Sequence, residues 1–272
     1  LLSKLYPSGV RKALSAESLE KSDIDQVRKM VKTLTDNAAE YDFVFVGNVD
    51  PETLKPLVEQ YIASIPGNAK TAVRGNVKVA PEYQLVKGTG TDRTTIEMTT
   101  PQTYVCIIES GNLPYTSKEA KIASAVGQIL SKRFISTIRE REGAVYSIGA
   151  SGSIDRFGEP NVEIATQFPM KPEMEEKVLK MIADEFKAME SNITEEELAP
   201  VREYSLKDLA DLREKNNGWF GHINGWLING VNSLDNAEQI WNEITVADLM
   251  NFVKKMNAQG NYRVVVMAPA EK

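Results

Sequence analysis

The stretch Ser131–Ala150 changes its hydrophobic period midway, and this change constrains the fold more than any other feature of the sequence. Leu130, Phe134 and Ile138 recur every four residues, which predicts one apolar face of an amphipathic helix. Gly143 then supplies a residue suited to the left-handed conformation that often ends a helix. A strand is predicted to follow, with one face made by Ala144, Tyr146, Ile148 and Ala150 and the other by Val145, Ser147 and Gly149.

This helix-to-strand corner carries two candidate functional residues, Arg139 and Tyr146. They flank the corner, so we expect both side chains to face the same groove. A guanidinium and a phenol are hydrogen-bond donors suited to holding a peptide carbonyl, or the oxyanion that forms from it. A solvated helix end followed by an ordinary strand tyrosine explains the same spacing equally well.

Composition excludes several classes of function. The chain has 272 residues, 42% of them hydrophobic and 26% charged, as in an ordinary globular protein. Its net charge of -6 argues against nucleic acid as the main partner, and no apolar run has the length of a membrane helix. Cys106 is the single cysteine, so an internal disulfide is excluded. The sequence opens LLSKLYPSG without Met, and we expect it to come from the middle of a longer protein.

Periodicity along the chain predicts an α+β fold, with a mainly antiparallel sheet and long helices packed on one face. A helix over residues 24–34, a strand over 41–46 buried on both sides and a helix from Pro51 come first. Residues 68–75 are polar and without periodicity, as in a linker. The remaining predicted elements are possible strands at 76–83 and 85–86, strands at 94–100 and 103–109, a helix at 116–142, a hairpin over 147–155 and 161–168, helices at 172–190 and 194–213, a helix after a capping box at Thr245–Asp248, and a last strand at 262–267.

The two ends of the sequence resemble each other. The apolar helix face formed by Val27, Met30, Val31 and Leu34 precedes YDFVFVGN, and the face formed by Leu249, Phe252, Val253 and Met256 precedes YRVVVMAP. Tyr41 and Tyr262 lie 262 − 41 = 221 positions apart, which is the size of a domain rather than of a solenoid repeat. Two homologous domains in tandem explain the match, and so does convergence on a common helix–strand unit.

Several segments together resemble the pitrilysin/insulinase family of zinc metallopeptidases. REREGAVYS is similar to the family's R-x-K/R-E-x-x-x-Y corner in the half that lacks the metal. FVFVGNVDPETLKPLVEQYIASIP resembles the close of a preceding family domain, and KNNGWF…NGWLING with ITVADL…NYRVVVMAP resembles the end of the next. The resemblance implies a pitrilysin/LuxS-like metallohydrolase domain. It divides the chain into residues 1–67 as the tail of a preceding homologous domain, residues 68–75 as a linker and residues 76–272 as a complete metal-free domain.

The same resemblance implies a function. Family members bind zinc through an inverted H-x-x-E-H helix, which this chain cannot contain because His222 is its only histidine. We therefore expect no zinc in this chain and zinc in an N-terminal half or a partner subunit. The resemblance implies that Arg139 and Tyr146 bind the backbone of a peptide or unfolded polypeptide and stabilise the tetrahedral intermediate, while the chain alone is inactive. If the source is bacterial, the periplasm or cell envelope is expected.

Three questions stay open at this point. A non-catalytic scaffold or binding subunit of the same fold fits the sequence as an alternative to the peptidase, and an unrelated α/β binding protein fits less well. His222 is expected to pack with Trp219, Phe220 and Trp226 or to lie at the edge of the groove, rather than to bind a metal. The three aromatic side chains line either a substrate chamber or a core. The run Glu195–Glu197 is interpreted as helix capping.

Overall fold

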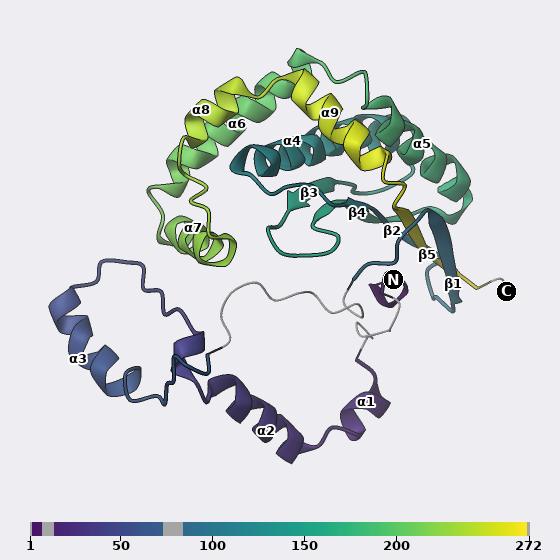
Figure 1. Ribbon diagram of the computed structural model, residues 1–272. Coiled ribbons are helices and arrows are strands. Elements are labelled where there is room, and N and C mark those ends of the chain that lie inside the picture. Colours follow the sequence, from purple (N-terminus) through teal and green to yellow (C-terminus); the bar gives the residue numbers. More distant parts are fainter. Residues whose placement is uncertain (1, 7–13, 73–83, 271–272) are drawn as a thin grey trace. The chain divides into compact units, whose positions relative to one another are not determined.

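The computed structural model describes residues 2–6, 14–72 and 84–270 (Figure 1). The chain divides into two units. One, here called the sheet unit, consists of Leu1–Arg11, Lys78–Leu209 and Leu234–Lys272, and the other, called the helical unit, consists of Lys12–Val77 and Ala210–Ser233.

Five strands make the sheet in the order β1-β5-β2-β4-β3. Their bounds are β1 Gly90–Ile96, β2 Thr103–Gly111, β3 Ala150–Ile154, β4 Val162–Met170 and β5 Tyr262–Pro269. Only the β1–β5 pair is parallel among the pairs of this sheet. The predicted α+β fold with a mainly antiparallel sheet is therefore confirmed. β2 and β5 are apolar on both faces, which is why they occupy inner positions.

The long helices cover one face of this sheet (Figure 1). They are α4 Ser117–Phe134, α5 Glu175–Ala188 and α9 Val246–Asn257. Two further helices, α6 Glu195–Leu212 and the short α8 Ala237–Glu243, contribute buried residues to the same core cluster. The predicted apolar face of α4 and its continuation is confirmed, because Leu130, Phe134 and Ile138 are all buried. In α9 the predicted capping box forms between Thr245 and Asp248.

Contact between α4 and β3 depends on glycine. A Cβ atom added to Gly152 would lie 2.0 Å from the carbonyl oxygen of Ala123, and one added to Gly127 would lie 2.3 Å from the Gly152 nitrogen. The Ser131 hydroxyl both donates to the Ala150 carbonyl (2.8 Å) and accepts from the Ala150 amide (2.6 Å). These contacts fix the strand that follows the corner directly onto the helix that precedes it.

The core contains a buried carboxylic acid. Glu109 on β2 lies opposite Tyr262 on β5 in the strand register, and its side chain faces the helices with only 2% of the residue exposed. One carboxyl oxygen of Glu109 and the Tyr262 hydroxyl are buried without a hydrogen-bond partner among the described residues. Burial and the negative charge of Glu190 raise the pKa of Glu109 to about 8, and burial and Glu109 raise the pKa of Tyr262.

A small second cluster of buried residues lies on the opposite face of the sheet. Leu5 and Leu85 pack there against Cys106, Ile108 and Val265. The Val86 amide donates to the Leu5 carbonyl (2.8 Å), which ties the first described residues to the segment before β1. Burial raises the pKa of the Cys106 thiol. Residues 85 and 86 are not in a strand, and the possible strand over 76–83 lies outside the described residues.

In the helical unit the structure contradicts one clear prediction. Its helices are α1 Ala16–Glu20, α2 Ile24–Thr35, α3 Pro51–Tyr61 and α7 Asn216–Asn229. The predicted helices of the first 67 residues form, with Asp50 capping α3 through the amides of Glu52 and Thr53. Residues 41–46 form no strand, and Tyr41, Phe43 and Phe45 are exposed instead of buried. A strand needs neighbours for its backbone hydrogen bonds, and the described residues of this unit contain none.

A bilayer-spanning helix is absent from the described residues.

Candidate functional site

The site begins where the helix preceding the corner changes its hydrogen-bond pattern. After Phe134 the helix widens into a π-helical stretch, Ile135–Arg141. The Gly143 amide then donates to the Arg139 carbonyl (3.1 Å) and the Ala144 amide to the Ile138 carbonyl (3.2 Å). Gly143 has φ +60°, the left-handed conformation predicted for it. π-Helical turns are often found at functional sites because they reposition the side chains that follow.

Beyond Gly143 the predicted strand does not form as expected. Ala144, Val145 and Ile148 are buried whereas Tyr146 is exposed, so faces do not alternate with period two. The strand β3 begins only at Ala150, and Val145 makes an isolated bridge to Met170 at the end of β4. The prediction was wrong because the chain leaves the π-helical stretch as an irregular segment and joins the edge of the sheet as a strand only at Ala150. The hairpin of β3 and β4 that follows is confirmed, with a later start.

The residues before and after Tyr146 are fixed by contacts with the rest of the sheet unit, while the Tyr146 side chain is exposed. Before it, the Ala144 carbonyl accepts from the Lys171 amide (3.2 Å) and Val145 bridges to Met170. After it, Ile148 is buried. The Tyr146 side chain nevertheless has an exposed fraction of 88%. An aromatic ring with this exposure contributes almost nothing to the core.

Arg139 lies on the π-helical stretch and is also exposed. Neither its guanidinium nor the Tyr146 hydroxyl has a hydrogen-bond partner among the described residues, so both are available to a ligand. Tyr146 lines a pocket, and Arg139 does not line it. The expectation that both side chains face one groove stays a prediction.

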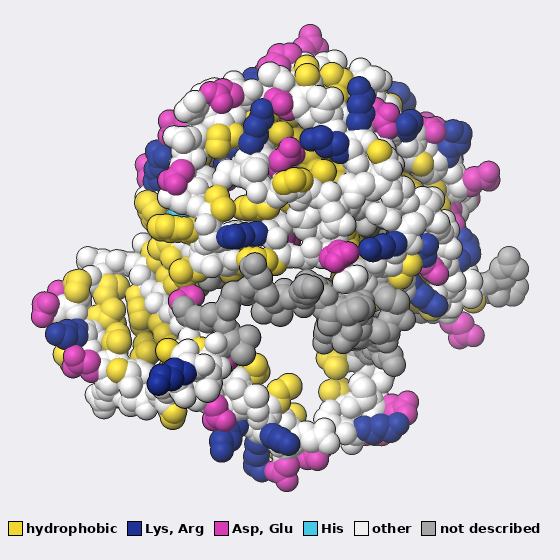
Figure 2. Space-filling model, viewed as in Figure 1, with side chains coloured by type: hydrophobic (Ala, Val, Ile, Leu, Met, Phe, Trp, Pro, Cys, Tyr) yellow, Lys and Arg dark blue, Asp and Glu magenta, His cyan; other side chains and the backbone are white. Residues whose placement is uncertain are grey.

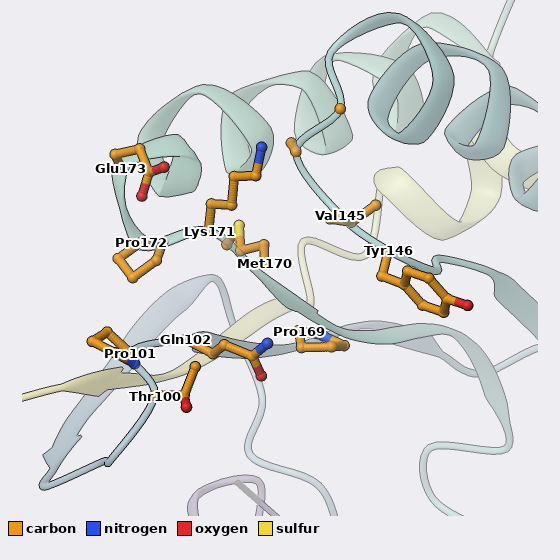
Figure 3. A pocket seen from close by; sticks show the side chains of 12 residues that line it. Thr100, Pro101, Gln102, Val145, Tyr146, Pro169, Met170, Lys171, Pro172 and Glu173 are labelled. Carbon is orange, nitrogen blue, oxygen red and sulfur yellow. The ribbon is translucent and has the colours of Figure 1, made fainter.

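The pocket beside Tyr146 has a volume of about 530 Å³, within the usual range for ligand pockets. It lies between the corner, the end of β4 and the segment that leads into β2 (Figure 3). Apolar side chains make most of the wall, and the polar groups are Thr100, Gln102, Lys171 and Glu173. Figure 3 shows the Tyr146 ring at one end of the pocket, with Glu173 and Lys171 toward the other. The apolar lining residues are Pro101, Val145, Pro169, Met170 and Pro172.

The sequence did not single out Gln102, Lys171 or Glu173. Each lies next to a proline that ends or follows a strand, Pro101 or Pro172, and those prolines were the only local signal. What joins these residues is the pairing of β2 with β4, which sets Thr103 opposite Met170. Such a long-range register is not visible in local periodicity.

A second hollow, of about 440 Å³, lies on the sheet face away from the helices. Its lining is mostly small or apolar: Cys106, Ile108, Gly149, Ala150, Ser151, Ala165, Thr166 and Gln167. It borders β3, an edge strand of the sheet. Ser131 satisfies both backbone groups of Ala150, and α4 lies against the Gly152 backbone, so α4 hinders the addition of a further strand at β3.

His222 on α7 is held by its neighbours. It is buried, its Nδ1 lies 3.1 Å from the Ser233 hydroxyl, and its ring stacks on Trp226 and meets Trp219 edge-on. The expected packing with Trp219 and Trp226 is therefore observed. Phe220, Trp226 and Ile228 are partly exposed, so the cluster is not a closed core.

These residues do not fit a zinc site. His222 belongs to the helical unit and Cys106 to the sheet unit, where it is buried. Among residues 2–6, 14–72 and 84–270, no group of three His, Cys, Asp or Glu side chains is placed to hold a metal ion. The run Glu195–Glu197 serves the helix instead, since Glu197 accepts from the Thr194 amide (3.0 Å) and from Arg133.

Comparison with protein families decides the relationship. The sequence profile described as the peptidase M16 inactive domain matches residues 23–204, which is more than half of the chain. The chain belongs to the M16 inactive-domain family. The match confirms the predicted relationship to the metal-free part of a pitrilysin/insulinase-family protease.

Solved structures support the M16 fold. The periplasmic protease PqqL from Escherichia coli aligns over 97% of this chain with 20% identity and a TM-score of 0.75. An M16 inactive domain from Pseudomonas fluorescens aligns over the whole chain with 18% identity and a TM-score of 0.75, and a Helicobacter pylori protease over 94% with 13% identity and 0.73. This chain covers 29%, 64% and 61% of those three proteins. A comparison with curated protein sequences gave no match.

Proposed function

We propose that this M16 chain forms the substrate-binding, zinc-free part of a zinc metallopeptidase. It binds a peptide or unfolded polypeptide, and the hydrolytic centre is completed by a zinc-bearing half that lies upstream in the same protein or on a partner subunit. The chain by itself is inactive, because its single histidine cannot make the zinc site.

The observation that carries this proposal is the position of Tyr146. Its backbone is held by Ala144 and Val145, and its ring stands 88% exposed at the end of a pocket that is mostly apolar. A phenol on a rigid support donates a hydrogen bond to a substrate oxygen without first having to be ordered. This role is effective only if water is excluded when the other half closes over the site.

Arg139 has a complementary role in the proposal. Its guanidinium adds a second donor and a positive charge on the same corner, where the tetrahedral intermediate develops negative charge. The apolar wall formed by Pro101, Pro169 and Met170 accommodates a side chain of the peptide next to the bond that is cut.

The bound peptide extends along a sheet edge as an added strand. Since α4 hinders addition at β3, the edge that remains for this purpose among the described strands is that of β1. After β1 the chain passes through Thr100 and Gln102, which line the pocket wall. For location, we propose the periplasm or cell envelope, because the similar E. coli protein is described as a periplasmic protease.

The experiment is a peptidase assay on an unstructured fluorogenic peptide, with zinc analysis, for this chain alone and after mixing with its zinc-bearing half. We expect no cleavage by the chain alone and zinc-dependent cleavage on mixing. In the mixture, Tyr146→Phe should lower kcat about 100- to 1,000-fold with little change in KM, as expected for the loss of one oxyanion donor. Arg139→Ala should lower kcat/KM by a similar factor.

Two variants serve as matched controls. Tyr204→Phe removes the same hydroxyl from an exposed tyrosine on α6, and Lys132→Ala removes an exposed positive charge from α4. Neither should change kcat/KM more than about twofold. Normal turnover in both Tyr146→Phe and Arg139→Ala would remove the assigned roles. Silence of a folded, zinc-loaded mixture would instead favour a scaffold or binding subunit, the function that the inactive-domain match also allows.

A further inference from the structure

The second hollow, called here the sheet-face hollow, lies on the face of the sheet away from the helices and has an uncharged lining. By contrast, Figure 2 shows charged side chains of both signs spread over the helices of the sheet unit. On the β3 side the Gly149 carbonyl already accepts from the Thr166 hydroxyl (2.6 Å), and both backbone groups of Ala150 are paired with the Ser131 hydroxyl. A charged side chain placed there would lose its hydration without gaining a partner, so the hollow suits an apolar group.

The chain itself shows how this face holds an apolar side chain. Leu5 is buried there, with 1% of the residue exposed, against a cluster that includes Cys106 and Ile108. Its carbonyl accepts from the Val86 amide (2.8 Å), so an apolar anchor and a backbone hydrogen bond hold the segment together. Cys106 and Ile108 also line the sheet-face hollow, which therefore continues the apolar surface that Leu5 occupies.

The sheet-face hollow is adjacent to the pocket beside Tyr146, because β4 and the segment after Gly143 line both. Tyr146 lines the pocket, and Gly149, three residues later, lines the hollow. On β4, Pro169 lines the pocket and Gln167 lines the hollow. These separations of two and three residues correspond to about 7 to 10 Å of extended chain, which a bound peptide also covers with about two or three residues.

We infer that the sheet-face hollow is a further subsite for the polypeptide substrate and accepts a large aliphatic side chain about two to four residues from the bond that is cut. The inference rests on the proposed function, since it takes the residue held beside Tyr146 to lie next to that bond. The occupant is a leucine-like side chain, because the adjoining surface buries Leu5 in the same chemical setting. The hollow has a volume of about 440 Å³, which is sufficient for such a side chain.

Alanine methyl groups give a readout that does not depend on the zinc-bearing half, because Ala150 and Ala165 line the hollow. The 272-residue chain, labelled with carbon-13 at its alanine methyl groups, is titrated with an unstructured serine-rich peptide that carries two leucines three residues apart. The reference peptide has serine in place of one leucine. We expect the Ala165 signal to shift with the two-leucine peptide, and the reference peptide to bind at least about tenfold more weakly.

Ser151 and Ser153 on β3 provide a matched pair of variants. Both are exposed and lie on the same face, opposite Ala165 and Glu163 of β4, but Ser151 lines the hollow and Ser153 does not. Ser151→Leu fills the hollow from its rim and should weaken binding of the two-leucine peptide about tenfold, whereas Ser153→Leu should change it less than about threefold. Urea denaturation verifies that both variants are folded, and the comparison of the two peptides on the wild-type chain decides the matter if either is not.

The outcomes separate this inference from the proposed function. An Ala165 signal that does not shift, equal affinity for the two peptides, or unchanged binding by folded Ser151→Leu would each overturn the subsite. Shifts of the Ala165 signal with protein concentration in the absence of peptide would overturn it in favour of a second copy of the chain as the occupant. Preference for the two-leucine peptide without cleavage after mixing with the zinc-bearing half supports the hollow as a peptide site and contradicts the peptidase. Cleavage without that preference does the reverse.

Discussion

Replacement of Glu109 by glutamine tests whether the buried carboxyl of Glu109 makes the stability of the sheet unit depend on pH. The pKa of Glu109 is raised to about 8, first by burial and then by the charge of Glu190. An acid whose pKa is raised by folding binds more protons in the folded state than in the unfolded state. The contribution of Glu109 to the free energy of unfolding is therefore fully present below its pKa in the unfolded chain. It is lost as the pH rises from that value through the pKa of Glu109 in the folded chain. Glutamine has the same shape and no proton to lose.

The magnitude follows from the two pKa values, 4.5 for the unfolded chain and about 8 for the folded one. Each pKa unit corresponds to about 1.4 kcal/mol, so this carboxyl lowers the free energy of unfolding by about 2.5 kcal/mol between pH 5 and pH 7. Glu109→Gln should be about as stable as the wild type near pH 4.5 and about 3 kcal/mol more stable at pH 7.

Urea titrations at pH 5, 6 and 7, followed by circular dichroism, measure this difference. Hydrogen exchange of peptides from β2 and β5 assigns the transition to the sheet unit. Glu97→Gln is the control, because it removes an exposed carboxyl near the same sheet and should leave the pH dependence unchanged. Parallel pH profiles for wild type and Glu109→Gln, or titration of the Glu109 carboxyl near pH 4.5 by NMR, would refute the reasoning.

Three further predictions concern stability and are checked by urea denaturation. Gly152→Ala should destabilise the sheet unit by about 3 kcal/mol or more, because the new methyl meets a carbonyl oxygen, whereas Gly149→Ala has room and should cost less than about 1 kcal/mol. Gly143→Ala should cost about 1 kcal/mol through its left-handed φ alone, since nothing lies within 4 Å of its Cβ position. Arg133→Gln should cost about 2–3 kcal/mol, because the largely buried guanidinium binds Glu185 and Glu197. Equal stability of Gly152→Ala and Gly149→Ala, or no loss in either of the other variants, would contradict these assignments.

Local patterns predicted most of the helices and strands of the sheet unit. A helix needs only its own residues for its hydrogen bonds, so the apolar spacing and the Thr245–Asp248 capping box were sufficient for α4 and α9. The shared face of β4, from Val162 to Phe168, is likewise confirmed by burial. Sheet order was not predicted. β5 enters between β1 and β2, which follow each other in the sequence, and this insertion depends on contacts between residues more than a hundred positions apart.

The candidate site was predictable only in part. The glycine at the corner has the expected conformation, and Tyr146 lines a pocket, while the roles assigned to Arg139 and Tyr146 stay predictions. The alternation expected over residues 144–150 was wrong, because it assumed that a strand starts directly after the glycine. In the π-helical stretch each backbone hydrogen bond spans five residues instead of four, and this changes which side chains face outward. Lys171 and Glu173 enter the site through the β2–β4 register, which no nearby sequence feature encodes.

The two segments that resemble each other in sequence, residues 24–46 and 249–267, show which elements form from local sequence and which need long-range contacts. α2 and α9 both form helices, since each has its own N-terminal cap and apolar spacing. Only the later segment forms a strand, because β1 and β2 accept its backbone hydrogen bonds. The aromatic and β-branched residues of 41–46 favour a strand as strongly as those of 262–267. Propensity therefore produces a strand only where neighbouring strands are present, and residues 41–46 form no strand because the described residues supply no strand to pair with them.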